Sequence, residues 1–462
     1  MAERNLQIEA NLLSRLERVP LNKGLYVVLA LLTWCWVIEA FDVGLIGQVV
    51  AVLTKIWDLS PNEIGLLGAS STAGVVIGTA SAGFLTDRYG RQRVLLVGTF
   101  IFTLFTLIGA AYENLVWIIL MRFISGLGAG AVFPQPYLMI SELAPAKYRG
   151  VLVGVCNAIL TFAFMLPTLC GSWAIETFSL DMAWRVPFVV GGLPIITLWA
   201  IYRYVPESPR WLLLHGRYDE VRRLVERFER HAHVEPDDTY VNPEILASLE
   251  KNLARSASWR DVFRAPYRSR SFVTWGLYTV GLINWYVIMV YLPSIITSYG
   301  LKLSTSVNLV GMLMVIAGVG GFTIGPIADR FGRKVACTLY IGITVACLFA
   351  LPGLESKMIM LVFGAIVAFF SIGANAIFKI YIAEQYPTEL RGVGTGLGET
   401  VARFVGGVLA TYYLAFFLAV GGASAVFIFL GVAYVAAIAA MWIWGKETAG
   451  KSVEAASSVH KN

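Results

Sequence analysis

Two long apolar runs are joined by a short polar turn, Gly83-Phe84-Leu85-Thr86-Asp87-Arg88-Tyr89-Gly90-Arg91-Gln92-Arg93. A second copy, Gly325-Pro326-Ile327-Ala328-Asp329-Arg330-Phe331-Gly332-Arg333-Lys334, follows 242 residues later, counted from Asp87 to Asp329. Another motif repeats at the same spacing: Glu142, Pro145, Arg149 and Gly150 match Glu384, Pro387, Arg391 and Gly392. Two motifs at one constant offset indicate an internal duplication, so the chain consists of two homologous halves.

The composition is that of a polytopic membrane protein. Hydrophobic residues make up 57% of the chain and charged residues 14%, and the mean hydropathy is +0.69. The five cysteines lie in apolar segments without the spacing of metal ligands, so we expect neither a disulfide framework nor a metal site. The sequence contains no phosphate-binding loop and no nucleophile motif, which argues against an enzyme and against a cofactor.

Apolar stretches long enough to cross a bilayer occur in twelve places. They lie near residues 24–54, 62–86, 94–113, 115–140, 150–177, 184–206, 271–298, 304–328, 335–354, 357–382, 392–418 and 422–445. We therefore expect an all-α membrane protein with two pseudo-symmetric six-helix bundles, residues 24–206 and 271–445. The remaining segments are an N-terminal tail, residues 1–23, a helical segment, residues 207–270, and a C-terminal tail, residues 446–462. The charged N-terminus lacks a cleavage site of small residues, so the first span does not read as a removable signal peptide.

The distribution of the 36 lysines and arginines predicts the orientation. Twenty-nine lie in the two tails, in the central segment and in the turns on the same side as these, whereas the opposite loops hold Lys55, Arg185, Lys302 and Lys357. Positive residues favour the cytoplasmic side, so both termini and the central segment are expected in the cytoplasm. This bias accounts for much of the isoelectric point near 9.0, and we expect no nucleic-acid partner.

The central segment has an apolar face at helical spacing. Its apolar residues are Leu213, Val221, Leu224, Val225 and Phe228, and a second short helix is expected to carry Ile245, Leu246, Leu249 and Leu253. A plain linker would not need such a face. We interpret the segment as charged helices lying under the transmembrane bundles.

The duplicated pattern Gly-x-Leu-x-Asp-Arg-x-Gly-Arg resembles the signature loop of the major facilitator superfamily. The string Pro206-Glu207-Ser208-Pro209-Arg210-Trp211-Leu212 and the C-terminal Lys446-Glu447-Thr448-Ala449-Gly450-Lys451-Ser452 resemble marks of its sugar-porter branch, which includes organic-ion carriers and synaptic-vesicle glycoproteins. The resemblance covers nearly the whole chain and implies a secondary transporter that works by alternating access. The alternative of another class is a receptor or scaffold with the same fold that does not move solute.

In that family, the Asp and Arg residues of the loop latch the two halves together on the cytoplasmic side. Electrostatics supports such a role, because Asp87 can cap the N-terminus of a helix in the other half while arginines pair with carboxylates such as Glu142. A role limited to membrane anchoring would explain the arginines but not the glycines or the aspartates. The residues assigned to gating are Gly83, Asp87, Arg88, Gly90, Arg91, Glu142, Arg149, Glu207, Arg210, Asp329, Arg330, Gly332, Arg333, Glu384 and Arg391.

Three basic residues fall within the predicted spans: Arg122, Lys379 and Arg403. A charge at mid-membrane costs about 2.5–3.5 kcal/mol, so each must be paired, hydrated or functional. Lys379 lies near a helix end and is expected to extend toward the membrane surface. Arg122 opens a Gly-rich stretch that resembles the family's second motif, which implies proton coupling; a structural hydrogen bond is the alternative. Arg403 is a candidate anion-binding residue, unless Glu399, four residues earlier on the same face, neutralises it.

Two acids, Glu39 and Asp42, lie three residues apart on one face of the first span. Both cannot comfortably ionise in a desolvated cavity, so one is expected to carry a proton. All four histidines lie outside the spans, which leaves Glu39, Asp42 and Arg122 as the proton-coupling candidates. The alternative is that the acids simply pair with Arg122 or Arg403. The duplication relates Asp42 to Asn284, and we expect both to face a central cavity.

Candidate substrate ligands surround these charges. Two prolines, Pro134 and Pro136, are expected to bend the fourth span near Gln135. A positive group, several amides and flat aromatic walls would suit a small planar organic anion. The residues assigned to substrate binding are Arg403, Gln135, Tyr137, Asn157, Phe162, Asn284, Trp285, Tyr291 and Asn375.

The mid-membrane arginine resembles the organic-anion members of the family, and the paired acids resemble bacterial aromatic-acid/proton symporters and niacin transporters. The pattern Phe41-Asp42-Val43-Gly44 lacks the second aspartate of many aromatic-acid symporters, which favours the niacin-like branch. The resemblance thus implies a monomeric proton symporter in the inner (plasma) membrane that imports nicotinate or a related aromatic or heterocyclic monocarboxylate. A porter for a sugar or another metabolite, or a polyspecific exporter, is the alternative.

Overall fold

The computed structural model describes residues 6–243, 245–247, 259–265, 267–298, 300–353, 357–386 and 388–448, and its secondary structure over these ranges is helical, without strands. Within these described residues, eleven helical stretches are long and apolar enough to cross a membrane. The last of them, Val393–Trp444, is 52 residues long and bends at Gly422, where φ is 63°, so it accommodates two crossings. The predicted all-α fold with twelve membrane helices is confirmed.

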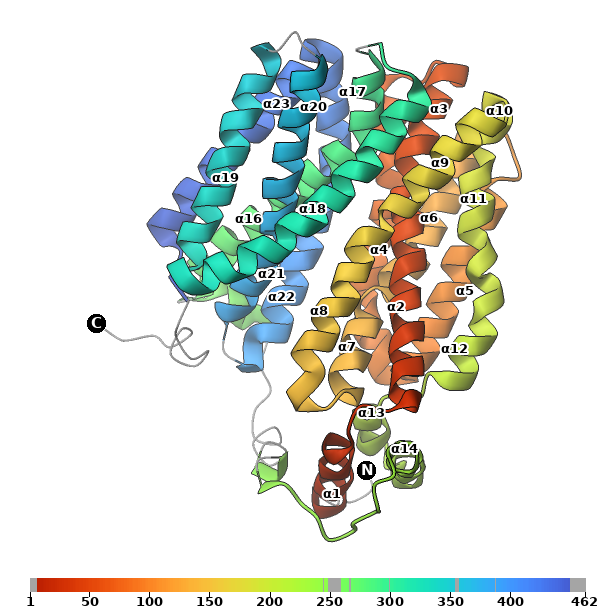
Figure 1. The fold of residues 1–462 in the computed structure, drawn as a ribbon, viewed down its shortest axis with the longest axis vertical. Helices are drawn as coiled ribbons and strands as arrows, with labels where there is room; N and C mark the ends of the chain where they lie inside the picture. The colour runs from red at the N-terminus through yellow and green to blue at the C-terminus, as the bar shows by residue number, and fades with distance from the viewer. Residues whose placement is uncertain are drawn as a thin grey trace.

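The N-terminal half contains six crossings, several of them interrupted (Figure 1). They consist of α2 (Lys23–Gly44) with α3 (Ile46–Trp57); α4 (Pro61–Tyr89); α5 (Arg91–Gly109); α6 (Leu115–Val132) with α7 (Pro134–Leu143); α8 (Ala146–Ala163) with α9 (Met165–Thr177); and α10 (Leu180–Ala183), α11 (Arg185–Gly192), η1 (Leu193–Thr197) and α12 (Leu198–Tyr204). The predicted bend near Gln135 is present, since α6 ends at Val132 and α7 begins at Pro134.

The C-terminal half repeats this pattern beside the first half (Figure 1). Its helices are α16 (Tyr267–Tyr286), η3 (Val287–Tyr291) and α17 (Leu292–Ser298); α18 (Leu303–Phe331); α19 (Arg333–Ala350) with η4 (Leu351–Gly353); α20 (Lys357–Val367), η5 (Ala368–Ile372) and α21 (Gly373–Glu384); α22 (Thr388–Arg403) with η6 (Phe404–Leu409); and α23 (Ala410–Trp444). Three of the interruptions, η3, η5 and η6, are π-helical turns.

Short helices cover one end of the molecule, which we call the basic end (Figure 1). They are α1 (Leu6–Arg18), α13 (Pro209–Leu214) and α14 (Tyr218–Ala232), and η2 (Trp259–Phe263) precedes the C-terminal half. The segment expected to be an N-terminal tail thus contains a helix, α1, which packs on α14. Arg15 of α1 is buried and donates two hydrogen bonds, of 2.7 and 3.0 Å, to the Glu229 carboxylate. Of the expected second short helix, Ile245 and Leu246 are helical, and Leu249 and Leu253 lie outside the described residues.

Local sequence signals set individual helix ends and contacts. Ser60 and Glu63 form a reciprocal capping box that starts α4, with Pro61 in the first turn.

Glycines along α4 and α6 permit close packing of these two helices. A Cβ added to Gly74 would lie 2.1 Å from the Phe123 carbonyl oxygen, and one added to Gly126 would lie 2.0 Å from the Ser71 carbonyl oxygen. Small residues at such contacts let membrane helices approach closely.

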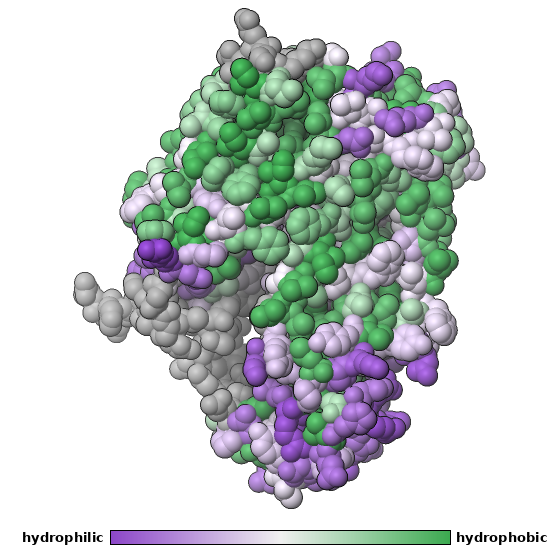
Figure 2. Space-filling model, in the orientation of Figure 1, coloured by the Kyte–Doolittle hydropathy of each residue, from purple (hydrophilic) through white to green (hydrophobic). Residues whose placement is uncertain are grey.

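The surface matches a membrane environment. Hydrophobic residues cover most of the middle of the visible face, and hydrophilic residues gather at the basic end (Figure 2). Many large apolar side chains are exposed, for example Ile196, Trp199 and Phe416. Exposure of apolar surface on this scale is expected where lipid, and not water, surrounds the helices.

The two halves pack together through α3, α4 and α9 on one side and α17, α18, η3 and α23 on the other. A Cβ added to Gly47 would lie 2.0 Å from the Met289 carbonyl oxygen, so α3 and η3 are in backbone contact. Hydrogen bonds also cross between the halves, from Ser172 to the Ser304 carbonyl at 3.2 Å and between the hydroxyls of Thr72 and Tyr286 at 2.8 Å. This packing encloses a space between the halves.

Candidate functional site

A cavity of about 340 Å³ lies between the two halves. Helices α2 and α8 of the N-terminal half and α16, α18, α21 and α22 of the C-terminal half contribute to its walls. Its charged lining residues are Glu39, Lys379 and Arg403, its aromatic ones are Phe133, Phe164, Tyr278, Trp285, Tyr286 and Phe322, and one amide, Asn375, also lines it. The cavity thus combines charges of both signs with flat apolar walls, as binding sites for small polar aromatic molecules do.

Aromatic rings from both halves meet across the cavity. Phe164, the residue before α9, and Trp285 of α16 are in edge-to-face contact, with ring centroids 5.2 Å apart. Trp285 also contacts Tyr286, with ring centroids 5.0 Å apart. Phe133, which separates α6 from α7, brings a third ring to the wall. Rings arranged in this way offer flat apolar surface and polar hydroxyl groups together.

Arg403, the predicted anion-binding residue, lines the cavity. Its Nε donates a 2.8 Å hydrogen bond to Glu399, and its guanidinium carbon lies 4.4 Å from the centre of the Phe133 ring. The ion pair with Glu399, which the sequence left as an alternative, is therefore present. Its two terminal nitrogens have no hydrogen-bond partner among the residues that the structure describes, so they can still meet a carboxylate.

Lys379 also lines the cavity, which corrects the expectation that it extends toward the membrane surface. Its ammonium lies 5.9 Å from the ring centres of both Phe133 and Tyr278, which are themselves lining residues. An ammonium between two aromatic faces is stabilised electrostatically. Because these rings come from different halves, the side chain reaches into the space between them.

Glu39 lines the cavity, whereas Asp42, three residues further along α2, does not. The Asp42 carboxylate is fully buried and forms a 2.7 Å ion pair with Arg122, which donates a second bond of 2.8 Å to the Asp42 carbonyl. Thr106 and Ser125 donate further hydrogen bonds to this carboxylate. The pairing of an acid with Arg122, which the sequence left as an alternative, is thus the observed arrangement, and a proton-coupling role of Asp42 and Arg122 stays a prediction.

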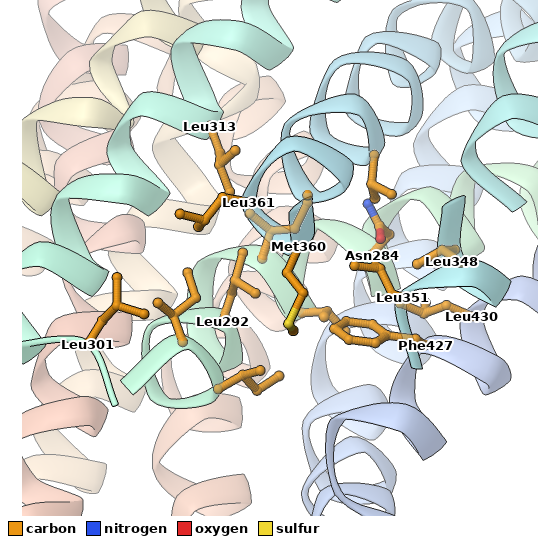
Figure 3. Close-up of a pocket in the computed structure, with 16 residues that line it drawn as sticks. Asn284, Leu292, Leu301, Leu313, Leu348, Leu351, Met360, Leu361, Phe427 and Leu430 are labelled. Carbon is orange, nitrogen blue, oxygen red and sulfur yellow. The ribbon is translucent and has the colours of Figure 1, made fainter. Parts of the chain in front are cut away.

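A second, apolar pocket of about 70 Å³ lies inside the C-terminal half (Figure 3). Asn284 is one of its lining residues and stands among leucines, including Leu292, Leu348 and Leu351. Its amide donates a 2.7 Å hydrogen bond to Ser371. Asp42 and Asn284 therefore do correspond, but both lie inside their own halves and not at the central cavity as expected. The reason is that each finds hydrogen-bond partners within its own bundle.

The other predicted ligands divide into two groups. Trp285 and Asn375 line the central cavity, and the buried Asn375 carbonyl oxygen has no hydrogen-bond partner among the described residues. The cavity lining does not include Tyr291, Gln135, Tyr137 or Phe162. The Tyr291 hydroxyl donates to the Thr411 carbonyl, and the buried Gln135 amide donates to the Ala131 carbonyl at 3.0 Å. Tyr137 packs on Trp36, and Phe162 stacks on Phe322. The side chain of Asn157 lies outside the described residues. The binding roles of all these residues stay predictions.

At the basic end, the first motif turn is held by a carboxylate from the segment that follows α12. Glu207 accepts hydrogen bonds from the backbone N–H groups of Arg91, at 2.7 Å, and Gln92, at 3.2 Å, and so caps the N-terminus of α5. Gly90 has φ 95°, and a Cβ added there would lie 2.2 Å from Glu207. Arg91 pairs with Glu142, which also accepts a hydrogen bond from Ser208.

The second motif turn repeats this arrangement with residues from the C-terminal end of the described chain. Glu447 accepts hydrogen bonds of 2.9 Å from the backbone N–H groups of Arg333 and Lys334, beside Gly332 with φ 100°. Arg333 pairs with Glu384 at 3.0 Å, and the Thr448 hydroxyl donates to the same carboxylate. Glu447 and Thr448 thus do in the second half what Glu207 and Ser208 do in the first, which explains the glycines as well as the arginines of the motif.

The remaining gating residues are more exposed. The Asp87 carboxylate has no hydrogen bond or ion pair within the described part of the chain, whereas Asp329 pairs with Arg333. Arg88 and Arg330 each lie 5.4 Å from the ring of the residue that follows, Arg210 is exposed, and Gly83 has open space at its Cβ position. The side chains of Arg149 and Arg391 lie outside the described residues. A latch between the halves therefore stays a prediction.

Several residues at these sites were not predicted. Phe133, Tyr278 and Tyr286 line the cavity, and neither their spacing nor their type separates them from other aromatics of the spans. Glu447 and Thr448 could have been recognised from the sequence. The dipeptide Glu207-Ser208 follows the first half and Glu447-Thr448 follows the second, and their separation in the chain nearly equals that of the two motif turns.

Comparisons with known proteins agree with this architecture. A family profile described as "Sugar (and other) transporter" matches residues 29–459. The niacin transporter NiaP of Acinetobacter baylyi is 30% identical over 446 residues, which cover 96% of this chain and 99% of that protein. The 4-hydroxybenzoate transporter PcaK of the same organism is 26% identical over 341 residues, which cover 73% of this chain and 72% of that protein.

Among solved structures, the partially occluded inward-open form of the xylose transporter XylE of Escherichia coli has the same fold. Its TM-score to this chain is 0.74 at 19% sequence identity, over 93% of this chain and 99% of that one. The fold is thus one found in membrane transporters, and the matching family and relatives are transporters, not enzymes. The chain belongs to the sugar (and other) transporter family of the major facilitator superfamily.

Proposed function

We propose that this transporter imports a small aromatic or heterocyclic monocarboxylate, with nicotinate as the first candidate, by symport with protons. The observation that carries the proposal is the central cavity, where Arg403 and Lys379 stand among aromatic rings. The terminal nitrogens of Arg403 suit a carboxylate, and the walls suit a planar ring. Two relatives are transporters of niacin and of 4-hydroxybenzoate, which are both aromatic monocarboxylates, and this supports the same substrate class.

Proton coupling is assigned to Glu39. The residue is 2% exposed and lines the cavity, and its carboxyl group has no hydrogen bond or ion pair within the described part of the chain. A carboxylate that is neither paired nor well hydrated exchanges a proton at moderate cost, whereas the Asp42 carboxylate is already paired with Arg122. We assign the basic end to the cytoplasm of a cell with an inner (plasma) membrane, in line with the distribution of lysine and arginine.

Transport requires the halves, residues 24–206 and 271–445, to rock about the cavity. The contact between Gly47 and Met289 closes the end opposite the basic end, so the proposed state of this structure is inward-facing. During this motion each half would be held rigid by its own network, that of Arg91 with Glu142 and Glu207 or that of Arg333 with Glu384. Asp87 has no described partner here, and it would engage the other half only in the outward-facing state.

The test is uptake of labelled nicotinate and 4-hydroxybenzoate into proteoliposomes that contain the purified protein. We expect uptake to rise as the external pH falls and to stop with a protonophore. Arg403→Lys should weaken binding and Arg403→Ala should weaken it more, by about 2–5 kcal/mol as for truncation of a charged partner. Uptake of a sugar in place of these acids, or no uptake of any solute, would contradict the proposal.

A further inference from the structure

The charged groups of the central cavity do not all have partners. Arg403 and Glu399 neutralise each other through their 2.8 Å ion pair. Lys379 and Glu39 line the same cavity, but neither has an ion-pair or hydrogen-bond partner within the described residues. The cavity therefore contains one uncompensated cation and one uncompensated carboxylate, which come from opposite halves.

Lys379 is directed at the space that a substrate would occupy. Its ammonium approaches two lining rings, Phe133 of the N-terminal half and Tyr278 of the C-terminal half, at 5.9 Å each. The guanidinium of Arg403 approaches the same Phe133 ring at 4.4 Å. Two cations from one half thus converge on one ring of the other, and a carboxylate beside that ring could contact both.

Glu39 is placed to respond to what binds Lys379. The charged side chains that act electrostatically on Glu39 are Arg403, Asp42, Lys379 and Glu399, and the hydroxyls of Tyr278 and Tyr286 line the same space. Asp42 is compensated by Arg122, and Glu399 and Arg403 compensate each other. Among these groups Lys379 is therefore the cation that has no ion-pair partner of its own within the described residues.

We propose that Lys379 receives the substrate carboxylate and that Glu39 takes up one proton when it does so. Without substrate, the two free charges balance each other across the cavity. A bound carboxylate replaces Glu39 as the counter-charge of Lys379, and a proton from water converts the Glu39 carboxylate to a neutral carboxyl group, so that the cavity again has no net charge. A neutral analogue cannot replace that counter-charge and would bind without the proton. This inference rests on the proposed function and specifies how its anion and its proton are coupled.

The experiment measures binding and proton uptake together on the purified full-length protein in weakly buffered solution, with nicotinate, 4-hydroxybenzoate and the neutral amide nicotinamide as probes. For the wild type we expect close to one proton taken up per bound nicotinate and tighter binding of nicotinate than of nicotinamide. Glu39→Gln should bind nicotinate with no proton uptake. Lys379→Met should weaken nicotinate binding at least about tenfold, as for loss of a hydrogen bond to a charged group, and leave nicotinamide binding within about twofold.

Two further variants separate charge from structure. Lys379→Arg keeps the positive charge and should retain the preference for the acid, and Lys302→Met removes one exposed lysine outside the cavity and should behave as wild type. An unchanged acid preference in Lys379→Met, or continued proton uptake in Glu39→Gln, would overturn the inference while the transport of aromatic acids stands. If the wild type binds neither nicotinate nor 4-hydroxybenzoate, the proposed function fails and this site assignment fails with it.

Discussion

Two acids three residues apart on α2 have opposite surroundings. Asp42 is fully buried and is held by Arg122, Thr106 and Ser125. Glu39 lines the central cavity and has no described partner. Disturbing a buried charge that has a complete set of hydrogen bonds costs several kcal/mol. A charge without hydrogen-bond or ion-pair partners has no such interactions to lose. The two acids thus fit the division that we propose on this helix between a structural charge, Asp42, and an exchangeable one, Glu39.

The comparison also explains why the family fold can contain several ionised groups in the membrane. Ions such as Asp42 and Arg122 are paired within one half, so in the proposed transport cycle they would move together with that half. The ions that we propose take part in transport, Glu39 and Lys379, line the cavity between the halves. Three substitutions test this division by their effect on stability.

The largest effect is expected for Arg122→Met, which leaves Asp42 buried without its cation. The loss of unfolding free energy should be about 3–5 kcal/mol, as for a broken buried ion pair. Thermal unfolding of the purified protein in detergent measures it. The double variant Asp42→Asn/Arg122→Met removes both charges and should recover part of the loss; a wild-type unfolding temperature for Arg122→Met would show that the ion pair does not stabilise the bundle.

An intermediate effect is expected for Thr106→Val, which keeps the side-chain shape and removes one hydrogen bond to the Asp42 carboxylate. Because that bond is made to a charged group, its loss should cost about 1.5–3 kcal/mol. Thr103→Val on the same helix is the matched control, since the Thr103 hydroxyl donates to uncharged backbone carbonyls, those of Thr99 at 2.7 Å and Phe100 at 3.3 Å. Equal losses in the two variants, measured by thermal unfolding, would argue against a special role of the charge.

The smallest effect on stability is expected for Glu39→Gln. This side chain has no described hydrogen bond or ion pair to lose, so unfolding free energy should stay within about 0.5 kcal/mol of wild type. The same unfolding assay measures it, and it should be run at the pH used for binding. A loss as large as that of Thr106→Val would mean that Glu39 belongs to the fixed network, and the assignment of Glu39 as the exchangeable acid would then be wrong.

Several features of the site followed from the sequence, because they depend on local spacing. The bend near Gln135 was predicted from Pro134 and Pro136, and the ion pair of Arg403 with Glu399 was left as an alternative by their spacing of four residues. The placement of Lys379 and Asn284 did not follow, since it depends on which neighbouring helix each side chain meets. Lys379 reaches Phe133, which lies far away in the sequence and in the other half.

The sequence by itself determined the twelve spans, the duplication at 242 residues and the three intramembrane cations, because hydropathy, motif spacing and charge are properties of the chain alone. Only the tertiary structure decided which charges are free. Glu39 and Asp42 lie less than one helical turn apart, yet Asp42 meets α5 and α6 with their hydroxyls and arginine, while Glu39 meets the cavity. Helix periodicity gives a direction within one helix, but the partner in that direction is set by packing between helices.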